Sequence, residues 1–355
     1  MTNIDIQMTQ EPKAKPDATR LGFGRHFTDH MLIMDYNADK GWHDARVVPH
    51  APIPLSPASP ALHYALEIFE GLKCYKNADG GLQLFRPKDN FLRLNRSAKR
   101  LGIPAPDIES CMDCLRALLK IDGHWTPDLP GTSLYIRPLI IASDARLGLH
   151  TPREFLFIII LSPVGTYYAS GFAPVDIFVE DQDVRAVRGG LGEAKTGANY
   201  AAAMRASARA EEHGFSQVLW LDGVERKYIE EVGAMNVFFA YGDDLYTPPL
   251  NGSILPGITR DSVIRLARHF GKKVFEERMD IDRVLADIRG GKLTEAFGAG
   301  TAAVIAPLGK LRYKGEDFVP GDGKTGPVAQ FYYKALYGIQ TGSAEDPMGW
   351  VTRLD

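Results

Sequence analysis

The longest apolar run in the chain, FLFIIIL at residues 155–161, is the feature that narrows the possible folds most. A membrane-spanning helix needs roughly 20 apolar residues, and this run is far shorter. A short apolar run rich in isoleucine and phenylalanine is typical of a buried strand. The sequence therefore predicts a strand inside a packed domain at this position.

The segment after this run divides the chain nearly in half. Gly165, Gly171 and Pro174 interrupt it before a new strand, VDIFVE, begins at residue 175. With 355 residues, 45% of them hydrophobic and 24% charged, the chain is long enough for two globular domains. We expect a flexible arm at 1–20, a small N-terminal domain at 21–168, a linker at 169–180 and a large C-terminal domain at 181–355.

The charge balance argues against a nucleic-acid or membrane partner. The 41 basic and 44 acidic side chains leave a net charge of −3, which creates no strong overall field. Residues 1–20 mix acids with bases and contain no apolar segment, unlike a secretory signal or a transit peptide. We therefore predict a cytoplasmic protein that binds neither nucleic acid nor membranes.

Cysteine and histidine spacing gives little support for a disulfide or metal site. Cys74, Cys111 and Cys114 are too few for a disulfide framework. The last two form a C-x-x-C pair, but apolar residues recur around them at helical spacing and no second pair completes a zinc site, which favours helix packing over a redox or metal role. His26 and His30 lack the glutamate of a zinc-protease helix, so we expect no metal there.

Apolar periodicity predicts helices and hairpins in both halves. Residues 71–87 read as a hairpin, and residues 216–229 read as two strands around an Asp-Gly turn. A helix should follow Asp89 as its N-cap and end at Gly102, and an alanine-rich helix should cover 198–213. Helices that alternate with mostly antiparallel strands predict an α+β fold for both domains.

Two glycine-rich stretches lack residues that nucleotide sites require. GDGKTG at 321–326 resembles the end of a phosphate-binding P-loop, but Phe318 occupies the position of its first glycine. Gly190 and Gly192 are followed by Lys195, where the dinucleotide fingerprint needs Gly or Ala. We therefore exclude a nucleotide kinase and a dinucleotide fingerprint at these positions.

Lys195 lies among small residues in GEAKTGANYA, at the start of the alanine-rich helix. The positive end of a helix dipole disfavours the ammonium form of a lysine placed there. Because a neutral amine attacks an aldehyde, the position suits a lysine that bonds covalently to a carbonyl compound. From these residues alone, an exposed loop lysine is an equally good interpretation.

Two further stretches have the composition of anion-binding turns. PGIT at 256–259 precedes a predicted helix, so the amides of Ile258 and Thr259 should point outward as in a phosphate site, with Thr259 placed to cap the helix. FGAGTAAV at 297–304 is a small-residue turn that a ligand can approach closely. Each is also compatible with a simple tight turn. Together with Lys195, they suggest a phosphate-bearing aldehyde, pyridoxal phosphate.

Seven motifs occur in the order seen in branched-chain amino acid aminotransferases: FEGLK, LFRP, SLYIRP, EAKTGANYA, EVGAMNVFF, TPPLNGSILPGITR and FGAGTA. From about Phe23 to about Gly338 the chain resembles this family, which consists of pyridoxal phosphate enzymes of fold type IV. The resemblance implies a two-domain α+β fold. It also implies transfer of the amino group between L-leucine, L-isoleucine or L-valine and 2-oxoglutarate by a ping-pong mechanism, in branched-chain amino acid metabolism.

The resemblance assigns a role to each residue that matches the family's cofactor site. Lys195 would hold pyridoxal phosphate covalently and move the substrate's α-proton, and Tyr200 would hydrogen-bond the cofactor's O3′. Glu231, rather than Glu230, would face the pyridine nitrogen, because the motif places the acid directly before Val232. The implied phosphate ligands are Arg93, Ile258, Thr259 and Thr301.

The implied substrate pocket accepts both an apolar side chain and the side-chain carboxylate of glutamate. Arg137 and tyrosine hydroxyls would bind that carboxylate, and the amides of Thr301 and Ala302 would bind the α-carboxylate. In relatives, part of the pocket around Tyr135 and the loop near Leu149 comes from the partner subunit, so the resemblance implies a homodimer. The implied walls are Phe23, Tyr64, Phe69, Tyr135 and Tyr167.

Two departures from the family and three alternatives accompany this interpretation. Ala303 and Ala306 replace a C-x-x-C redox pair that some members carry, and Ala234 replaces a threonine of close relatives, which removes one hydroxyl contact to the cofactor. A D-amino acid aminotransferase and an aminodeoxychorismate lyase share the fold, but SLYIRP and LNGSILPGITR argue against both. A non-catalytic cofactor carrier would need neither Arg137 nor the aromatic pocket.

Overall fold

The computed structural model describes residues 2–168 and 171–354, which divide into two compact units. Unit 1 contains residues 2–168, 194–197 and 338–354, and unit 2 contains residues 171–193 and 198–337. Both units combine helices with mostly antiparallel strands, so the predicted α+β architecture is confirmed.

Unit 1 is built on one sheet of nine strands. These are β1 (Asp5–Ile6), β2 (His30–Asn37), β3 (Gly41–Pro49), β4 (Glu67–Phe69), β5 (Leu72–Lys76), β6 (Leu82–Phe85), β7 (Ser133–Ala142), β8 (Glu154–Val164) and β19 (Val351–Leu354). The strand order is β1-β3-β2-β8-β7-β5-β6-β19, with β4 beside β7. The predicted buried strand is the central part of β8, and the predicted hairpin is β5–β6.

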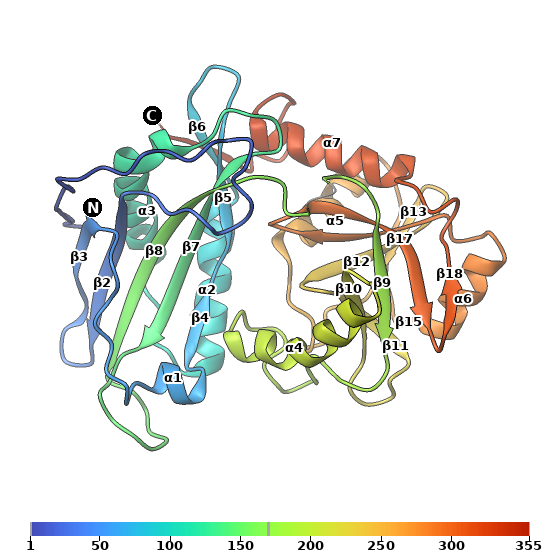
Figure 1. Cartoon of the computed structure of the whole chain (residues 1–355), viewed down its shortest axis with the longest axis horizontal. Coiled ribbons are helices and arrows are strands. Elements are labelled where there is room, and N and C mark those ends of the chain that lie inside the picture. Colours follow the sequence, from blue (N-terminus) through green and yellow to red (C-terminus); the bar gives the residue numbers. More distant parts are fainter. Residues whose placement is uncertain (1, 169–170, 355) are drawn as a thin grey trace. The chain divides into compact units, whose positions relative to one another are not determined.

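The core of unit 1 lies between this sheet and two helices. The helical elements are α1 (Pro60–Tyr64), α2 (Pro87–Leu101), α3 (Ile108–Asp122) and the short 3-10 helix η1 (Gly123–Trp125). α2 and α3 cover one face of the sheet, as Figure 1 shows. Cys111 and Cys114 of α3 are buried in this core, and burial raises the pKa of both thiols. The helix-packing interpretation of the C-x-x-C pair agrees with this placement.

The N-terminal residues are packed against unit 1, in place of the flexible arm expected from the sequence. β1 pairs in parallel with β3 at the edge of the sheet. The backbone amide of Thr9 donates to Nε2 of the buried His30 at 2.9 Å, and the amide of Lys13 donates to Asp29 at 2.8 Å. His30 also contacts Asp122 at 2.8 Å, so its role is structural. Composition alone does not reveal these long-range hydrogen bonds.

Unit 2 contains a ten-stranded sheet, part of which closes on itself. Its strands are β9 (Val175–Glu180), β10 (Gln217–Leu221), β11 (Tyr228–Val232), β12 (Met235–Tyr241), β13 (Asp244–Thr247), β14 (Val274–Glu276), β15 (Met279–Asp280), β16 (Glu295–Gly300), β17 (Val304–Tyr313) and β18 (Glu316–Phe318). β12, β16, β17, β9, β10 and β11 follow one another in the sheet, and β11 also pairs with β12. These strands therefore form a closed ring.

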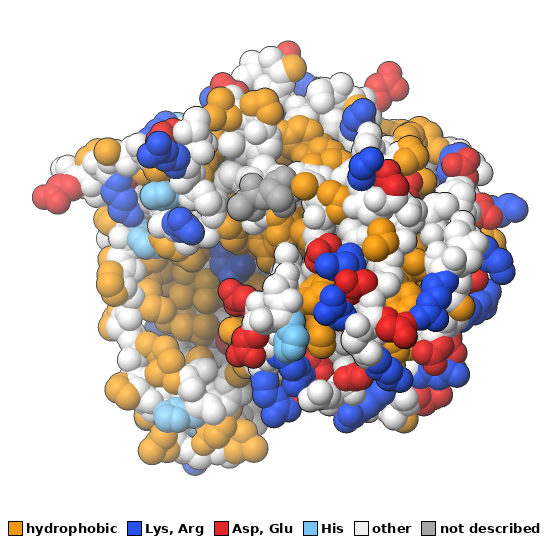
Figure 2. All heavy atoms as spheres, turned by 45° about the vertical axis from the view of Figure 1, so that its right-hand side comes forward, with side chains coloured by type: hydrophobic (Ala, Val, Ile, Leu, Met, Phe, Trp, Pro, Cys, Tyr) orange, Lys and Arg blue, Asp and Glu red, His pale blue; other side chains and the backbone are white. Residues whose placement is uncertain are grey.

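Helices pack around this ring. They are α4 (Gly197–Glu212), α5 (Ile258–His269), α6 (Ile281–Arg289) and α7 (Pro327–Thr341). The small side chains of its alanines let α4 lie close to β10. Ala206 and Ala210 pack on Val218 and Trp220 of that strand. On the face of unit 2 visible in Figure 2, basic and acidic side chains are interspersed, as the near-zero net charge predicts. Neither unit contains, within its described residues, a helix long and apolar enough to cross a membrane.

The unit boundaries differ from those expected. The second half of the expected linker, from Val175 on, is strand β9 of unit 2, while residues 169–170 lie outside the described residues. Residues 338–354 return to unit 1, where β19 pairs with β6. The C-terminal part of the expected large domain therefore completes the sheet of unit 1.

Candidate active site

The segment that carries Lys195 is hydrogen-bonded to unit 1 although the chain on both sides of it belongs to unit 2. The backbone amide of Phe69 donates to the Lys195 carbonyl at 3.0 Å, and the Lys195 amide donates to Oγ of the buried Ser97 at 2.9 Å. The amide of Gly197 donates to the carboxylate of Glu67. These bonds fix the backbone of Lys195 directly before α4 begins.

The aromatic ring of Phe69 contacts two cations of unit 1. The Lys195 amine lies 4.7 Å from the ring centroid and the Arg137 guanidinium 4.6 Å from it. Arg137 also donates to the hydroxyl of Tyr135 at 3.2 Å. A ring face attracts a positive charge, so the Phe69 ring stabilises the position of both the amine and the guanidinium. The structure thus groups four of the residues predicted for the site.

Phe23 and Tyr167 extend this group into an aromatic wall. The ring centroids of Phe23 and Tyr135 are 4.9 Å apart, and those of Phe23 and Tyr167 are 5.3 Å apart, both in edge-on geometry. The hydroxyl of Tyr135 occupies the space that a Cβ at position 71 would take, so only Gly71 fits beneath it. This wall offers apolar ring surface together with hydroxyl and guanidinium groups.

Glu67 is partly buried beside this group. Burial raises the pKa of its carboxyl, while the Gly197 amide and the charge of Arg137 act to lower it. Because its carboxylate accepts from the first residue of α4, it caps the helix that follows the lysine. The sequence analysis did not single out Glu67.

Arg93 forms a fully buried ion pair with Glu70. Nε and one terminal nitrogen of Arg93 donate to the two carboxylate oxygens at 2.7 and 2.8 Å, and Asn90 donates to the same carboxylate at 2.8 Å. Burial acts to raise the pKa of Glu70, but the charge and hydrogen bond of Arg93, the charge of Lys195 and the hydrogen bond from Asn90 together outweigh burial and lower the pKa. The predicted phosphate ligand is therefore a positioned guanidinium and not a solvated helix charge.

In unit 2, the carboxylate of Glu231 is held by three groups. The amide of Leu255 donates to one oxygen at 2.9 Å, Asn236 donates to the same oxygen at 3.4 Å, and Nε of Arg185 lies 3.2 Å from the other. Glu231 and Arg185 are both buried. The neighbouring Glu230 accepts instead from Ser253. Successive residues of a strand point to opposite faces, which explains the separation of the two acids.

Asn236 connects Glu231 to the beginning of α5. Its side-chain oxygen occupies the space that a Cβ at Gly257 would take, and no side chain caps the helix at Gly257. A helix N-terminus without a side-chain cap favours an anionic ligand. Ile258 and Thr259 are buried in the first turn, so the prediction that Thr259 caps the helix is wrong, and the helix begins two residues earlier, at Ile258.

The second small-residue turn joins β16 to β17. Thr301 and Ala302 are partly buried in it, and Val304, the first residue of β17, has a φ of 63°. This left-handed conformation is rare for a β-branched residue and costs on the order of 1–3 kcal/mol, a form of strain that clusters at functional sites. Gly300 lies against Met235, where a Cβ would be 3.0 Å from the methionine side chain.

Two predicted residues lie in helices, one in each unit. Tyr200 belongs to the first turn of α4 in unit 2 and is partly buried. Tyr64 is the last residue of α1 and is 45% exposed. Sequence reasoning missed Glu70, Ser97 and Arg185, of which only Glu70 lies in a quoted motif, FEGLK.

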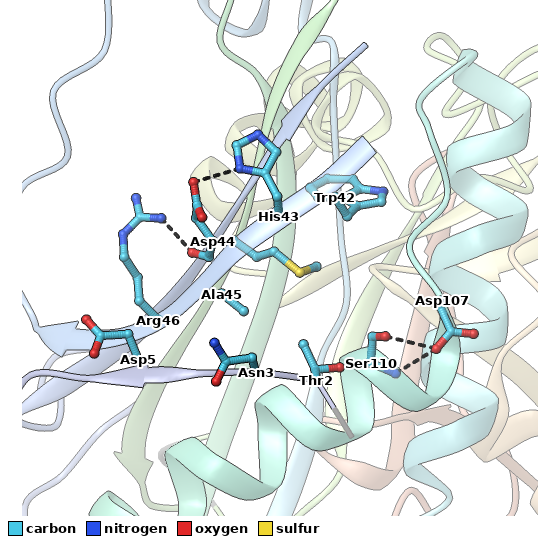
Figure 3. Close-up of a pocket in the computed structure, with 11 residues that line it drawn as sticks. Thr2, Asn3, Asp5, Trp42, His43, Asp44, Ala45, Arg46, Asp107 and Ser110 are labelled. Carbon is cyan, nitrogen blue, oxygen red and sulfur yellow. Dashed lines mark hydrogen bonds and ion pairs between the residues drawn. The ribbon is translucent and has the colours of Figure 1, made fainter. Parts of the chain in front are cut away.

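A separate cavity of about 660 Å³ lies at the N-terminal edge of unit 1. Figure 3 shows it between the first residues of the chain, β3 and the start of α3, with His43 bonded to Asp44 and Ser110 bonded to Asp107. Among the described residues that line it, none is a predicted site residue. It is therefore not the candidate active site.

The donor groups of the two units match one kind of ligand. Unit 1 offers the amine of Lys195 and the guanidinium of Arg93, and unit 2 offers the carboxylate of Glu231 and the helix N-terminus at Ile258. An aldehyde, a phosphate and a basic ring nitrogen would each find a complementary group. Pyridoxal phosphate combines these three features, so the groups of each unit, taken separately, suit a part of this cofactor.

Comparisons with known proteins agree with this donor set. Residues 67–311 match the amino-transferase class IV family. Branched-chain-amino-acid aminotransferase 2 of Bacillus subtilis is 51% identical over 99% of this chain and 97% of its own length. The solved branched-chain amino acid aminotransferase of Escherichia coli superposes with a TM-score of 0.78 at 30% identity, covering 92% of this chain and 99% of that one.

Solved structures of a further relative contain ligands. The T.th. branched-chain amino acid aminotransferase with pyridoxamine 5′-phosphate superposes with a TM-score of 0.75 at 28% identity, covering 91% of this chain and 98% of that one. The same relative has been solved with N-(5′-phosphopyridoxyl)-L-glutamate and with 4-methylvaleric acid. Those ligands belong to the relative, and one of them joins a phosphopyridoxyl group to L-glutamate.

Proposed function

The chain belongs to the class IV aminotransferases and, among them, to the branched-chain amino acid aminotransferases, and from this premise we infer that it exchanges the amino group between branched-chain L-amino acids and 2-oxoglutarate. Its cofactor is pyridoxal 5′-phosphate. The observation that carries the inference is the placement of Lys195, whose backbone is fixed by Phe69 and Ser97 and whose amine lies on the Phe69 ring.

We propose that the described donor groups hold this cofactor. Arg93, oriented by Glu70, and the N-terminus of α5 at Ile258 and Thr259 would bind its phosphate, with Thr301 as a further ligand. Lys195 would hold its aldehyde carbon, and Tyr200 would donate a hydrogen bond to its ring oxygen. When bound, pyridoxal phosphate supplies an electron sink for negative charge on the substrate's α-carbon.

Two residues would act on protons during the reaction, one by transferring a proton and the other by stabilising one. The amine of Lys195, once released, takes the proton from the substrate's α-carbon and returns a proton on the way to product. The carboxylate of Glu231 keeps a proton on the pyridine nitrogen by accepting a hydrogen bond from it. Arg185, Asn236 and the Leu255 amide hold that carboxylate in one orientation.

The substrate side of the site would combine the aromatic wall with Arg137. Phe23, Phe69 and Tyr167 offer apolar surface for a leucine side chain, and Arg137 with Tyr135 offers donors for the side-chain carboxylate of glutamate. The amides of Thr301 and Ala302 would bind the α-carboxylate. This pairing of apolar and cationic groups supports two alternating substrates.

We also propose that the protein is a homodimer. The side chains of Leu62, Tyr64, Leu147 and Leu149 are exposed in unit 1, and Leu149 is 86% exposed. Contiguous exposed apolar patches mark contact surfaces, and these side chains come from α1 and from the connection between β7 and β8. A partner subunit would bury these side chains. The predicted cytoplasmic location stays a prediction.

The experiment is the visible absorption spectrum of the purified protein before and after addition of L-leucine, with D-alanine as control. We expect a yellow band that L-leucine bleaches and D-alanine leaves unchanged. A band that only D-alanine bleaches would establish a D-specific enzyme of the same fold. A band that neither amino acid changes would contradict transamination and support a non-catalytic carrier.

A further inference from the structure

Lys73 is a buried cation of unit 1 that the proposed mechanism leaves without a task. It lies in β5 and is only 7% exposed. Its neighbours Leu72 and Cys74 point into the core between the sheet and α2 and α3. Because side chains alternate along a strand, Lys73 and Tyr75 point to the opposite face of the sheet.

That opposite face also carries two of the substrate residues. In the antiparallel pairing of β5 with β7, Lys73 lies directly across from Tyr135, so their side chains share one face. Arg137 follows two positions later on the same side of β7 and donates to the Tyr135 hydroxyl at 3.2 Å. Tyr75, Tyr135 and Arg137 are the titratable or charged residues that β5 and β7 place on this face, and the Lys195 amine lies on the Phe69 ring that Arg137 also contacts.

Burial lowers the pKa of the Lys73 amine to about 8. A lysine in such surroundings changes its charge within the range in which most enzymes work. An arginine side chain, by contrast, stays charged at every physiological pH. The two cations of this face therefore differ in whether the charge can be removed.

We propose that Lys73 is a specificity-determining residue that binds the side-chain carboxylate of the dicarboxylic substrate as an ammonium group and gives up its proton more readily when an apolar side chain occupies the same face. The proposal rests on the proposed function, because it concerns the second substrate of that reaction. It addresses a physical difficulty. A permanent charge next to a leucine side chain is costly, whereas a lysine can lose its charge.

The linkage between binding and charge fixes the direction of the pH dependence. A bound carboxylate favours the ammonium form and raises the pKa of Lys73 above its value of about 8 in the chain without substrate. Below pH about 8 the ammonium is already present, and dicarboxylate affinity is at its maximum. Above this pH, binding must take up a proton, so affinity falls until pH exceeds the pKa of the complex.

The test compares two unreactive ligands of the holoenzyme by isothermal titration calorimetry at pH 7 and pH 9.5. Glutarate represents the dicarboxylic substrate, and 4-methylpentanoate represents the apolar one. For Lys73→Met we expect glutarate to bind about tenfold more weakly at pH 7, while 4-methylpentanoate binds within about twofold of the parent. At pH 9.5 the parent should take up more protons with glutarate than with 4-methylpentanoate, and Lys73→Met should not.

A second variant and a matched control complete the design. Lys73→Arg keeps a permanent charge, so it should bind glutarate without the additional proton uptake and bind 4-methylpentanoate more weakly. Lys76→Met changes a lysine of the same strand that pairs with Asp128 at the surface, and it should match the parent for both ligands. If Lys73→Met loses affinity for both ligands, the proposal is tested by the glutarate affinity and proton uptake of Lys73→Arg.

Glutarate affinity and proton uptake unchanged in both Lys73 variants would overturn the proposal. That outcome is distinguishable from failure of the proposed function. The parent holoenzyme is first tested for bleaching by L-leucine alone, a half-reaction that involves no dicarboxylate. A parent that L-leucine does not bleach contradicts the proposed function, whatever the glutarate titrations give.

Discussion

Phe69 fixes both ends of Lys195: its backbone amide donates to the Lys195 carbonyl at 3.0 Å, and its ring centroid lies 4.7 Å from the Lys195 amine. Ser97 adds a bond to the Lys195 amide at 2.9 Å. A lysine side chain loses up to about 2 kcal/mol of conformational freedom when it is held in one place. Because Phe69 already holds the Lys195 side chain in place, less conformational freedom has to be lost during the reaction.

Replacing this lysine should stop catalysis without unfolding the protein. Lys195→Ala removes the amine that holds the cofactor and moves the α-proton, while the backbone bonds to Phe69 and Ser97 remain. We expect transamination to fall by on the order of 1,000-fold, with the far-ultraviolet circular dichroism unchanged. Turnover of L-leucine with 2-oxoglutarate near the parent rate would contradict the role of Lys195.

Gly71→Ala should disturb the donors for the second substrate. The added Cβ would occupy the space of the Tyr135 hydroxyl, which accepts from Arg137. Such overpacking costs about 1–3 kcal/mol, and here it is relieved by moving the ring. We expect KM for 2-oxoglutarate to rise about tenfold while L-leucine is less affected. Gly165→Ala is the control, since the nearest atoms to its Cβ lie at 3.9 Å, and equal KM values in both variants would refute the steric argument.

The elements of the fold were predictable where the signal is local. Both hairpins and the helix that ends at Gly102 follow from apolar periodicity and turn residues. The helix starts were less accurate. α2 begins at Pro87 after Arg86, which has a φ of 52°, and not after Asp89, because proline suits the first helical position. Asp89 lies in the first turn, where Arg86 pairs with it at 2.6 Å.

The long-range features were not predictable from one sequence. The Lys195 segment belongs to unit 1 through bonds to Phe69 and Ser97, which are distant in the chain. Composition around Lys195 left an exposed loop lysine equally plausible, and only the family motifs separated the two interpretations. Arg185, which holds Glu231, lies in no motif, and its role appears only once the strands are folded.

Asp222 should give the protein acid-dependent stability at the β10–β11 connection. Burial acts to raise its pKa, but hydrogen bonds from four backbone amides of the turn outweigh this and lower the pKa to about 2, from 3.8. Since the folded-state pKa is the lower one, the stabilisation is complete above pH about 4 and is lost as pH falls through about 2. Asp222→Asn should therefore lose about 1–2 kcal/mol at pH 7.

Thermal unfolding midpoints at pH 7 and pH 3 measure this difference. The gap between the parent and Asp222→Asn should narrow at pH 3, because the carboxylate of the unfolded parent chain is then mostly protonated while that of the folded chain is still mostly ionised. Asp243→Asn is the control, because Asp243 forms an exposed pair with Lys272, which contributes little. A gap that is the same at both pH values would mean that the charge of Asp222 has no part in stability.

Glu231→Gln should separate cofactor binding from proton transfer. Glutamine keeps the size of the side chain and can still accept from the Leu255 amide, but it removes the negative charge that faces Arg185. A neutral partner no longer stabilises a proton on the pyridine nitrogen, so negative charge on the α-carbon is less well stabilised. We expect the half-reaction with L-leucine to slow by on the order of 100-fold, with cofactor still bound. Glu230→Gln is the matched control, since that carboxylate accepts from Ser253, and equal slowing in both variants would show that burial of charge in β11, not contact with the cofactor, is responsible.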